Sequence, residues 1–460
     1  MRSEADTATA EELLDRSRMT PLHRRIWLVA ALGLMLDGFD FFLIGVCLPL
    51  ITADLDPSPI ETGLIASSAV VGSVVGSLAG GPLADRIGRR RVFQADLALF
   101  VVAALACALA WGVWPLIVFR FVLGIAIGAD YPLSSSYAAE IAPGRLRRRL
   151  LVGVISFQAV GSLLGVLTGL VILRLDPSAG SWRWILGSGA LLAVVVVVAR
   201  IGVPESPRWL AARGRREEAA AVVSRLVRQP VLPAQVEVSD AEPVPWRALF
   251  GTGLRRLTTL TSVPWFLLDV VVYGVGVFTP TVLAGAAVED SGGFVDEAIT
   301  SLRQTAVTNV FLVLGFAAAI VVINRAGVVR LQSAGFALVS VGLTLLALSA
   351  GLPGDSGAYY WLAFAGFALT NFFQNLGPNS TTFVLPAMVF PTEVRASGAG
   401  FGAAAGKAGA VLVTLCFPVL QEVWGLAVTV GVMAGGAMLA AVVTVLARPA
   451  PTPGRDQSSP

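Results

Sequence analysis

Long apolar stretches alternate with short polar loops along almost the whole chain. Each stretch is about 18 to 25 residues or longer, the length that a helix needs to cross the apolar core of a bilayer. A helix also satisfies its own backbone hydrogen bonds in lipid. The pattern therefore predicts an all-α integral membrane protein with twelve transmembrane helices, at 25–52, 60–85, 92–110, 114–140, 149–173, 183–202, 256–285, 302–324, 331–350, 358–388, 396–420 and 424–446.

One long polar segment, 203–255, interrupts this pattern and leaves six apolar stretches on either side. Its first part, 206–228, has the pattern of a short helix pair, and its middle contains prolines and acidic residues. We therefore expect five parts: a cytoplasmic N-terminal tail (1–24), an N-terminal six-helix bundle (25–202), a cytoplasmic loop (203–255), a C-terminal six-helix bundle (256–446) and a cytoplasmic C-terminal tail (447–460).

The two halves echo each other weakly. The segment Gly80–Arg91 follows the second stretch, and the related Ile323–Arg330 follows the eighth. A glutamate, a proline and an arginine close together end both the fourth and the tenth stretches. They are Glu140, Pro143 and Arg145 in the fourth, and Pro391, Glu393 and Arg395 in the tenth. Parallel repeats of this kind predict two pseudo-symmetric bundles with a solute site between them, near the middle of the membrane.

Composition and charge agree with a membrane protein. Hydrophobic residues make up 55% of the chain and charged residues 14%, against about 25% charged in soluble domains. Basic residues cluster in alternate loops, whereas the loops 53–59, 111–113, 351–357 and 421–423 contain none. The positive-inside rule then predicts both termini in the cytoplasm and a multi-pass protein of the cell membrane. The basic charge is explained by topology, so we expect no nucleic-acid partner.

The chain carries little that suggests catalysis. Cys47, Cys107 and Cys416 all lie in apolar stretches, so we expect neither a disulfide nor a metal site. The only histidine, His23, lies in the N-terminal tail and is interpreted as a surface residue. The sequence shows no catalytic nucleophile with a matching general base, and no nucleotide-binding loop. We therefore expect no enzyme activity and no cofactor.

Ionisable residues inside a membrane span are costly, which makes each of them a candidate functional residue. The candidates are Asp37, Asp40, Asp96, Arg120, Asp130, Asp269 and Lys407. Lys407 is the only lysine of the chain and lies in the middle of a predicted span. A compact ammonium in a partly dry cavity suits the binding of an anion or of a carboxylate.

Asp37 and Asp40 are three residues apart and so lie on one side of the first predicted helix. Two carboxylates in a medium of low dielectric cannot both ionise cheaply, which suits a proton carrier. The alternative is that they cap a helix broken at Gly38. Asp130 follows a run of small residues and precedes Pro132, which predicts a carboxylate and the phenol of Tyr131 at the cavity.

Trp265, Asp269 and Tyr273 are spaced by four residues and form one stripe on the seventh predicted helix. The stripe offers two hydrogen-bond donors and one acceptor. An aromatic stripe alone would favour packing, but the carboxylate between the rings favours solute contact.

Amide side chains add to this set. They are Gln158 on the fifth predicted helix and Asn371, Asn375 and Asn379 on the tenth, which Pro378 is expected to kink. For Asn371 and Asn375, hydrogen bonding between helices is an equally good interpretation.

Several of these segments together resemble a known family. Asp85-Arg86-x-Gly88-Arg89-Arg90 resembles the signature loop of the major facilitator superfamily, and Pro204–Leu210 is similar to its branch of sugar and phosphate symporters. Within that branch the chain most resembles the phosphate:proton symporters, on the segments Asp37–Asp40, Gly128–Ser134, Trp265–Gly274, Gly377–Phe383 and Gly406–Gly409.

The resemblance implies roles for individual residues. Phosphate would contact Tyr131, Gln158, Trp265, Asp269, Tyr273 and Asn379, with Lys407 as the charge partner of the substrate or of Asp269. Asp37, Asp40 and Asp130 match the carboxylates of the family's proton route. Ion pairs at the cytoplasmic ends of the helices would form a conformational latch that opens as the halves rock, with Asp85, Arg89, Glu140, Arg145, Glu393 and Arg395 as candidates.

The chemistry of the candidates agrees with phosphate. Dihydrogen phosphate can donate hydrogen bonds to a carboxylate, whereas sulfate has no proton to donate at neutral pH and would leave a buried charge unpaired. We therefore expect proton-coupled symport of inorganic phosphate by a monomer in a lipid bilayer. Two alternatives stay open: proton symport of an organic anion, since Asp37–Asp40 also resembles the aromatic-acid:proton symporters, and a nutrient sensor that binds solute without transport.

Overall fold

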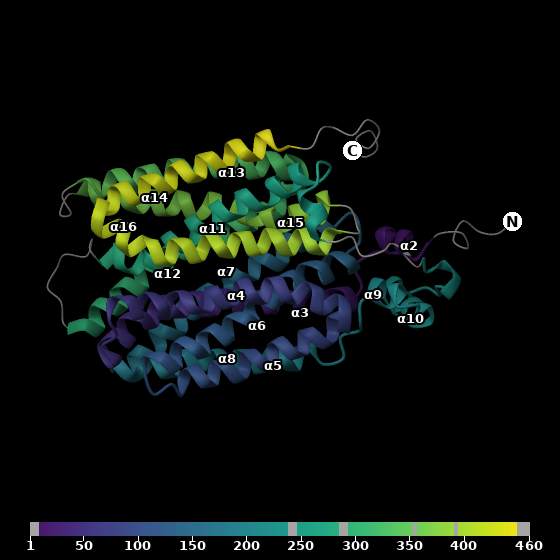
Figure 1. Cartoon of the computed structure of the whole chain (residues 1–460), viewed down its shortest axis with the longest axis horizontal. Helices are drawn as coiled ribbons and strands as arrows, with labels where there is room; N and C mark the ends of the chain where they lie inside the picture. Colours follow the sequence, from purple (N-terminus) through teal and green to yellow (C-terminus); the bar gives the residue numbers. More distant parts are fainter. Residues whose placement is uncertain (1–8, 238–245, 285–292, 353–356, 391–393, 449–460) are drawn as a thin grey trace.

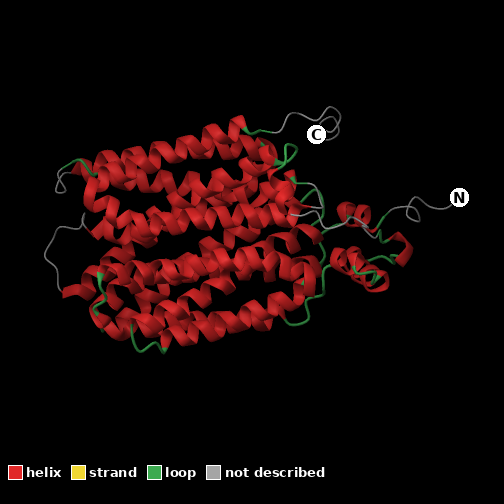
Figure 2. Ribbon diagram, viewed as in Figure 1, coloured by secondary structure: helices red, strands yellow, loops and turns green. Residues whose placement is uncertain are grey.

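A computed structural model describes residues 9–237, 246–284, 293–352, 357–390 and 394–448 of the chain. The described elements are all helices, as Figure 2 shows. Eleven of the described helical stretches are long and apolar enough to cross a membrane. The remaining predicted span, the tenth at 358–388, is formed by two shorter helices. The expected all-α fold with twelve spans is therefore confirmed.

The helices of the first half lie together in one bundle and those of the second half in another, with both bundles elongated in the same direction (Figure 1). The first bundle is made of α3 (Pro21–Leu55), α4 (Pro59–Ile87), α5 (Arg89–Ala108), α6 (Val113–Ile141), α7 (Arg147–Leu175) and α8 (Trp182–Arg200). The second is made of α11 (Arg255–Ala284), α12 (Gly293–Ala326), α13 (Val328–Ser349), α14 (Gly357–Leu376), α15 (Pro378–Val389) and α16 (Arg395–Leu446).

The helix α3 begins at Pro21, four residues before the predicted start. The Thr20 hydroxyl accepts a hydrogen bond from the backbone N–H of His23, and the Thr20 N–H donates to His23 Nδ1, so the two residues form a capping box. His23 is only 1% exposed. The interpretation of His23 as a surface residue was therefore wrong, because the cap folds its ring back into the helix end.

The tenth predicted span is broken, as Pro378 indicated. The helix α14 ends at Leu376 and α15 begins at Pro378, which has no N–H for the preceding turn. Side chains satisfy backbone oxygens here: Ser380 Oγ donates to the Asn375 carbonyl at 2.6 Å, and Thr381 Oγ1 donates to the Gly377 carbonyl at 2.8 Å. A Cβ on Gly335 of α13 would overlap Pro378, so α13 supports the break closely.

The last two predicted spans, 396–420 and 424–446, are joined in α16. Its only residue with non-helical dihedrals is Gly425, whose φ of +77° is a conformation that glycine adopts readily. The turn between the two spans therefore lies at Gly425, slightly after the predicted loop at 421–423.

Three small helices gather at one end of the bundles, as the right side of Figure 1 shows. The helices α9 (Pro207–Ala212) and α10 (Arg216–Val227) form the pair predicted within 206–228. The helix α2 (Ala10–Arg16) lies in the N-terminal tail and was not predicted. Its signal was the capping box of Thr9 and Glu12. Ion pairs attach α2 to its surroundings, between Asp15 and Arg147 at 2.5 Å and between Glu11 and Arg208.

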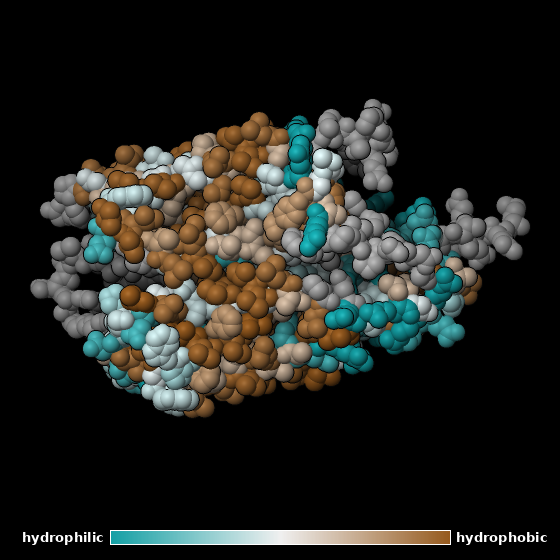
Figure 3. Space-filling model, viewed as in Figure 1, coloured by the Kyte–Doolittle hydropathy of each residue, from teal (hydrophilic) through white to brown (hydrophobic). Residues whose placement is uncertain are grey.

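The outer surface of the bundles is apolar around the middle of the helices (Figure 3). Exposed Leu and Val side chains are frequent along the helices, for example Leu191 and Leu439. Such a band needs an apolar solvent, which lipid supplies. The bundles meet where α4 packs against α16, α7 against α12 and α3 against α11. One buried apolar cluster spans this contact, and the candidate site lies within it.

Candidate functional site

Lys407 is the centre of the buried polar residues between the bundles. It is 5% exposed, and its Nζ donates a hydrogen bond to the Tyr273 hydroxyl at 2.6 Å. The same ammonium lies 5.2 Å from the ring centre of Tyr131 and 4.9 Å from that of Tyr273, both within range of cation–π attraction. Among the described residues no carboxylate lies within 4.0 Å of Nζ. The expected direct pair with Asp269 is therefore not formed in this conformation.

The predicted stripe on α11 faces this ammonium. Trp265, Asp269 and Tyr273 are all at least 94% buried. A Cβ on Gly406 would overlap the Trp265 indole and would lie 3.0 Å from Asp269 Oδ2. Gly406 therefore lets α16 approach α11 closely, which brings the next residue, Lys407, to the stripe. The stripe lies inside the protein and is not a belt at the lipid surface.

Aromatic rings from three other helices enclose the same place. Tyr131 of α6 lies 6.1 Å from the Trp265 ring and 5.6 Å from the Phe383 ring of α15, measured between ring centres. Phe41 of α3 lies 4.2 Å from the Tyr273 ring. Phe41 was not predicted as part of the site, although its position one turn after Asp37 on the same helix face was a usable signal.

Asp37 is held by an amide from α7. Gln158 Nε2 donates to Asp37 Oδ2 at 2.9 Å. A Cβ on Gly38 would overlap the Gln158 carbonyl, so the glycine permits the close contact of α3 and α7 that makes this bond possible. The helix α3 continues through Gly38 without a break. The alternative in which Asp37 and Asp40 cap a broken helix was therefore wrong.

Asp40 forms a buried ion pair with Arg120 of α6. The Arg120 guanidinium lies 3.6 Å from Asp40 Oδ2, and Arg120 Nε donates to the Ile65 carbonyl at 3.2 Å. A cavity of about 20 Å³ is lined by Asp37, Asp40, Arg120 and Tyr273 together with apolar residues. This volume suits roughly one water molecule, next to the two carboxylates and to Tyr273, the partner of Lys407.

Asp130 and its neighbour Tyr131 point to different places. Tyr131 lies at the aromatic site, whereas Asp130 Oδ1 accepts from Arg200 of α8 at 2.7 Å. The expectation that both side chains share the central cavity was therefore only half right, because consecutive helical residues diverge by about 100°. Arg200 also pairs with Asp96 of α5 at 3.3 Å. Arg200 was missed, since its position at a helix end had been explained by topology.

The asparagines of the tenth span bond to one another and to backbone carbonyls along the span. Asn379 Nδ2 donates to Asn375 Oδ1 at 2.8 Å, Asn375 Nδ2 to the Asn371 carbonyl at 2.7 Å, and Asn371 Nδ2 to the Phe367 carbonyl at 3.1 Å. The amide nitrogens of Asn371 and Asn375 therefore bond within α14, whereas that of Asn379 bonds from α15 to α14. Asn379 lies at the start of α15, one turn before Phe383, and uses its side-chain nitrogen in this bond.

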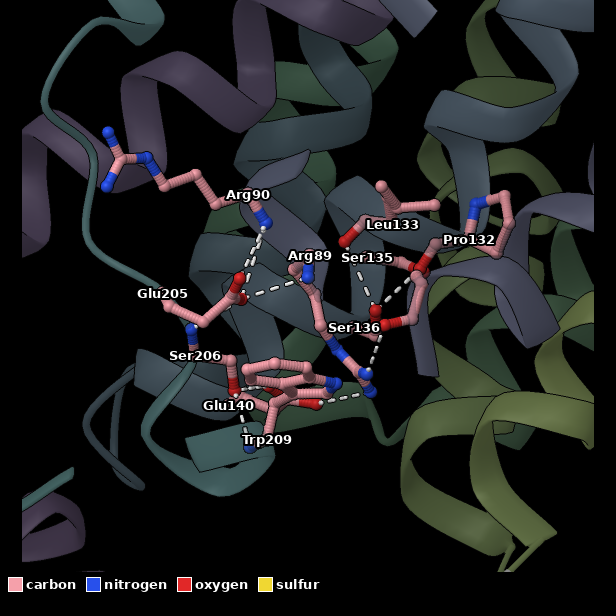
Figure 4. A network of polar contacts seen from close by, with 11 residues as sticks. Arg89, Arg90, Pro132, Leu133, Ser135, Ser136, Glu140, Glu205, Ser206 and Trp209 are labelled. Carbon is pink, nitrogen blue, oxygen red and sulfur yellow. Dashed lines mark hydrogen bonds and ion pairs between the residues drawn. The ribbon is translucent and has the colours of Figure 1, made fainter. Parts of the chain in front are cut away.

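A second polar network lies at the end of the bundle next to α9, and Figure 4 shows it closely. Arg89 lies 3.5 Å from Glu140, and the Ser206 hydroxyl also bonds Glu140. Glu205 accepts hydrogen bonds from the backbone N–H groups of Arg89 at 2.9 Å and Arg90 at 3.2 Å. The carboxylate thus caps the N-terminus of α5 from another segment. Glu205 was not predicted to take part.

The structure describes only some of the remaining latch candidates. The side chain of Asp85, residue Glu393 and the side chain of Arg395 lie outside the part of the chain that the structure describes. Arg145 is exposed. Of the predicted latch, the pair of Arg89 and Glu140 is therefore the part that the structure brings together.

Comparison with known proteins gives three consistent findings. The family model described as "Sugar (and other) transporter" matches residues 26–455. The inner membrane metabolite transport protein YgcS of Escherichia coli is 31% identical over 433 residues, covering 93% of this chain and 92% of YgcS. The low affinity inorganic phosphate transporter 4 of Lotus japonicus is 30% identical over 448 residues, covering 87% and 84% of the two chains.

Solved structures agree on the fold. The proton:xylose symporter XylE of the major facilitator superfamily, bound to 6-bromo-6-deoxy-D-glucose, superposes with a TM-score of 0.78 at 22% identity and covers 92% of this chain and 95% of XylE. A partially occluded inward open conformation of XylE from E. coli gives a TM-score of 0.77.

Proposed function

The chain belongs to the family of sugar (and other) transporters within the major facilitator superfamily, and from this premise we propose that it carries inorganic phosphate together with protons by alternating access. As a member of this family it is a multi-pass membrane transporter and not an enzyme. The observation that carries the proposal of an anionic substrate is the buried ammonium of Lys407, held 2.6 Å from Tyr273 between the two bundles.

The groups around Lys407 suit an oxyanion that can also donate hydrogen bonds. Lys407, Tyr131, Tyr273 and the Trp265 N–H supply positive charge and donors, and Asp269 supplies an acceptor. Dihydrogen phosphate offers both kinds of partner. Sulfate would leave the Asp269 carboxylate without a donor, which is costly in a buried site. Asn379 and Gln158 stay proposed phosphate contacts, Gln158 through the face of its amide that does not bond Asp37.

The relatives support the substrate class. The transporter of Lotus japonicus and the inorganic phosphate transporter 1-6 of rice, which is 30% identical over 460 residues, are both named for phosphate. XylE is named for xylose, a neutral sugar, which needs no buried ammonium. The cation at residue 407 therefore favours the phosphate relatives as the guide to the solute.

Proton coupling is proposed to use Asp37, Asp40 and Asp130. Protonation from outside would neutralise the carboxylates next to the site and permit the bundles to close around phosphate. Opening toward the cytoplasm would then let the acids lose their protons before phosphate leaves. Asp40 is paired with Arg120, and Asp130 is paired with Arg200, which also contacts Asp96.

The membrane orientation and the latch complete the proposal. We place both termini and the helices α2, α9 and α10 on the cytoplasmic side of the cell membrane, as the positive-inside rule predicts. Arg89 and Glu140 would hold that side closed, with Asp85, Arg145, Glu393 and Arg395 as further members of the latch. The domain limits stay those predicted from the sequence, and we propose that the monomer is the transporting unit.

The test is uptake of radiolabelled phosphate into sealed proteoliposomes, with and without an inward proton gradient. We expect stimulation by the gradient in the wild type and a loss of at least about a hundredfold in Asp269→Asn, since a buried group is left without its partner. A wild type without uptake in correctly oriented vesicles would refute phosphate transport. Retained binding to the purified protein in that case would indicate a nutrient sensor.

An organic anion is the second candidate, and the aromatic rings around Lys407 favour it. Phe41, Tyr131, Trp265, Tyr273 and Phe383 offer faces on which an aromatic carboxylate would stack. Competition separates the two candidates. Arsenate should inhibit uptake if the solute is phosphate, and benzoate should inhibit it if the solute is an aromatic acid.

A further inference from the structure

Three buried charged side chains from three helices meet beside the proposed proton route. Arg200, the last residue of α8, lies 2.7 Å from Asp130 Oδ1 of α6 and 3.3 Å from Asp96 Oδ1 of α5. The side chains of Arg200 and Asp96 are each 3% exposed and that of Asp130 is 9% exposed. A Cβ on Gly33 would overlap the Asp130 carboxylate and the Arg200 guanidinium, so α3 closes the cluster from a fourth side.

The charges of this cluster do not balance unless it holds a proton. One guanidinium, which stays charged in proteins, faces two carboxylates. A second carboxylate charge in a site of low dielectric is strongly disfavoured by its neighbour and by the loss of water. One proton on the pair of acids makes the cluster neutral.

The hydrogen bonds indicate which acid takes this proton. Both oxygens of Asp130 have donors, Oδ1 from Arg200 and Oδ2 from Ser134 Oγ at 3.3 Å. Asp96 Oδ1 accepts from the Leu97 N–H at 2.6 Å and from Arg200. Asp96 Oδ2 is buried and has no hydrogen-bond partner among the described residues. A charged carboxylate oxygen without a donor is costly there, and the neutral carboxylic acid costs less.

A small cavity borders both the cluster and Asp37. This cavity of about 10 Å³ is lined by Asp37, Asp96 and Asp130 with apolar neighbours such as Leu97 and Ile127. Asp37 also lines the cavity that holds Asp40 and Arg120. The charged groups around Asp96 are thus Asp37 from α3, Asp130 from α6 and Arg200 from α8. In the described part of the chain, α4 adds no residue to this cavity.

We propose that Asp96 is the proton-release residue of the transporter and that Arg200 is its positioning residue, an inference that rests on the proton coupling proposed above. After Asp96 has released its proton, the O–H bond of a newly protonated Asp130 breaks as that proton moves to the vacant Asp96 Oδ2, where a new O–H bond forms. Arg200 pairs with the Asp130 carboxylate that is left, so the charge of the cluster does not change. Asp96 then gives the proton to water at the end of α8, where the chain leads to α9.

A purely structural ion pair explains the cluster less well. Arg200 and Asp130 alone would form a neutral buried pair with good geometry. The second acid adds a contact with Arg200 at 3.3 Å but also a charge to be neutralised, and its outer oxygen lacks a partner among the described residues. A site that must bind and release one proton needs this extra acid.

The direct test is infrared spectroscopy of the purified full chain in lipid membranes, titrated with pH. The wild type should show the carbonyl band of a buried carboxylic acid, and Asp96→Asn should lack it. In Arg200→Gln the acid of the cluster should keep its proton to higher pH, because the cation that favours the charged carboxylates is gone. Arg200→Lys restores a cation and should restore most of the wild-type titration. Asp54→Asn is the matched control and should keep the band. It removes the carboxylate that lies 2.6 Å from the Arg183 guanidinium, at the opposite end of α8.

An unchanged band and titration in Asp96→Asn would overturn the inference. If Asp96→Asn does not fold, identical titrations of the wild type and Arg200→Gln would overturn it as well. Transport gives a second readout: net gradient-driven phosphate uptake by Asp96→Asn should fall at least about a hundredfold, as for loss of an acid–base group. Exchange of internal for external phosphate should fall far less. A wild type that does not transport phosphate refutes the proposed function, whereas the infrared titration still decides the role of Asp96.

Discussion

The ammonium of Lys407 on α16 lies 2.6 Å from the hydroxyl of Tyr273 on α11, and the two residues join helices that are distant in the sequence. This contact orients the only lysine of the chain toward Tyr131, Trp265 and Asp269. A buried ammonium with one neutral partner keeps donors available for an anion. The bond therefore fixes the cation without neutralising it.

Removing this hydroxyl should weaken anion binding. We expect Tyr273→Phe to raise the phosphate concentration needed for half-maximal uptake by about ten- to a hundredfold, because a hydrogen bond to a charged group contributes about 1.5 to 3 kcal/mol. The measurement is the concentration dependence of uptake in proteoliposomes. Tyr137→Phe is the matched control, since the Tyr137 hydroxyl bonds the Pro204 carbonyl at 2.6 Å away from the site. Equal effects of the two variants would contradict a role of Tyr273 in binding.

Breaking the pair of Asp40 and Arg120 on one side should destabilise the protein. We expect Asp40→Asn to lower the free energy of unfolding by about 3 kcal/mol, because the buried guanidinium loses its counter-charge. Thermal unfolding of the detergent-solubilised protein measures this loss.

The double variant Asp40→Asn with Arg120→Gln tests the cause. It should recover part of the lost stability, because both charges are then gone, while gradient-driven uptake should stay impaired. A double variant as unstable as the sum of the two single variants would show that the residues do not act as a pair.

Filling the contact between α16 and α11 should damage the site. Gly406→Ala adds a Cβ that overlaps the Trp265 indole, and overpacking of this kind costs about 1 to 3 kcal/mol. We expect reduced uptake and a lower unfolding temperature. Gly435→Ala lies on the same helix with no atom within 4 Å of the added Cβ and should behave as the wild type. A fully active Gly406→Ala would show that this close contact is not required.

Neutralising Glu205 should loosen the network at the end of α5. Glu205→Ala removes the acceptor of two backbone N–H groups, which we expect to cost about 1 to 2 kcal/mol, as for other helix caps. Glu217→Ala, an exposed acid on α10, is the control and should change stability little. Hydrogen exchange at the backbone amides of residues 89 and 90 reports the effect directly. Unchanged protection of these two amides would argue against the cap.

Much of the fold was predictable from the sequence because lipid imposes strong constraints on length and polarity. The spans follow from hydropathy, and the break before α15 follows from Pro378. The start of α3 and the existence of α2 depended on capping boxes, which are short signals in polar sequence. The kink at Gly425 could not be located from hydropathy, since both sides of it are equally apolar.

The candidate site was predicted less evenly. Residues that are costly in a membrane, such as Lys407 and Asp269, identify themselves by their charge. Arg200 and Glu205 do not, because charged residues at helix ends are common for reasons of topology. Their partners become visible only when three helices are packed together. The separation of Asp130 from Tyr131 likewise depends on which helix lies on each face of α6.

Lys407 also makes the protein suitable for labelling at one site with an amine-reactive reagent. With no other lysine, the protein presents a single side-chain primary amine, and that amine is 5% exposed. An amine-reactive probe can modify it only when the bundles separate, so the rate of modification measures how often the central site opens. The same property gives a peptide map in which every tryptic cut but one falls at arginine, and loss of the cut at Lys407 marks the molecules whose amine has been modified.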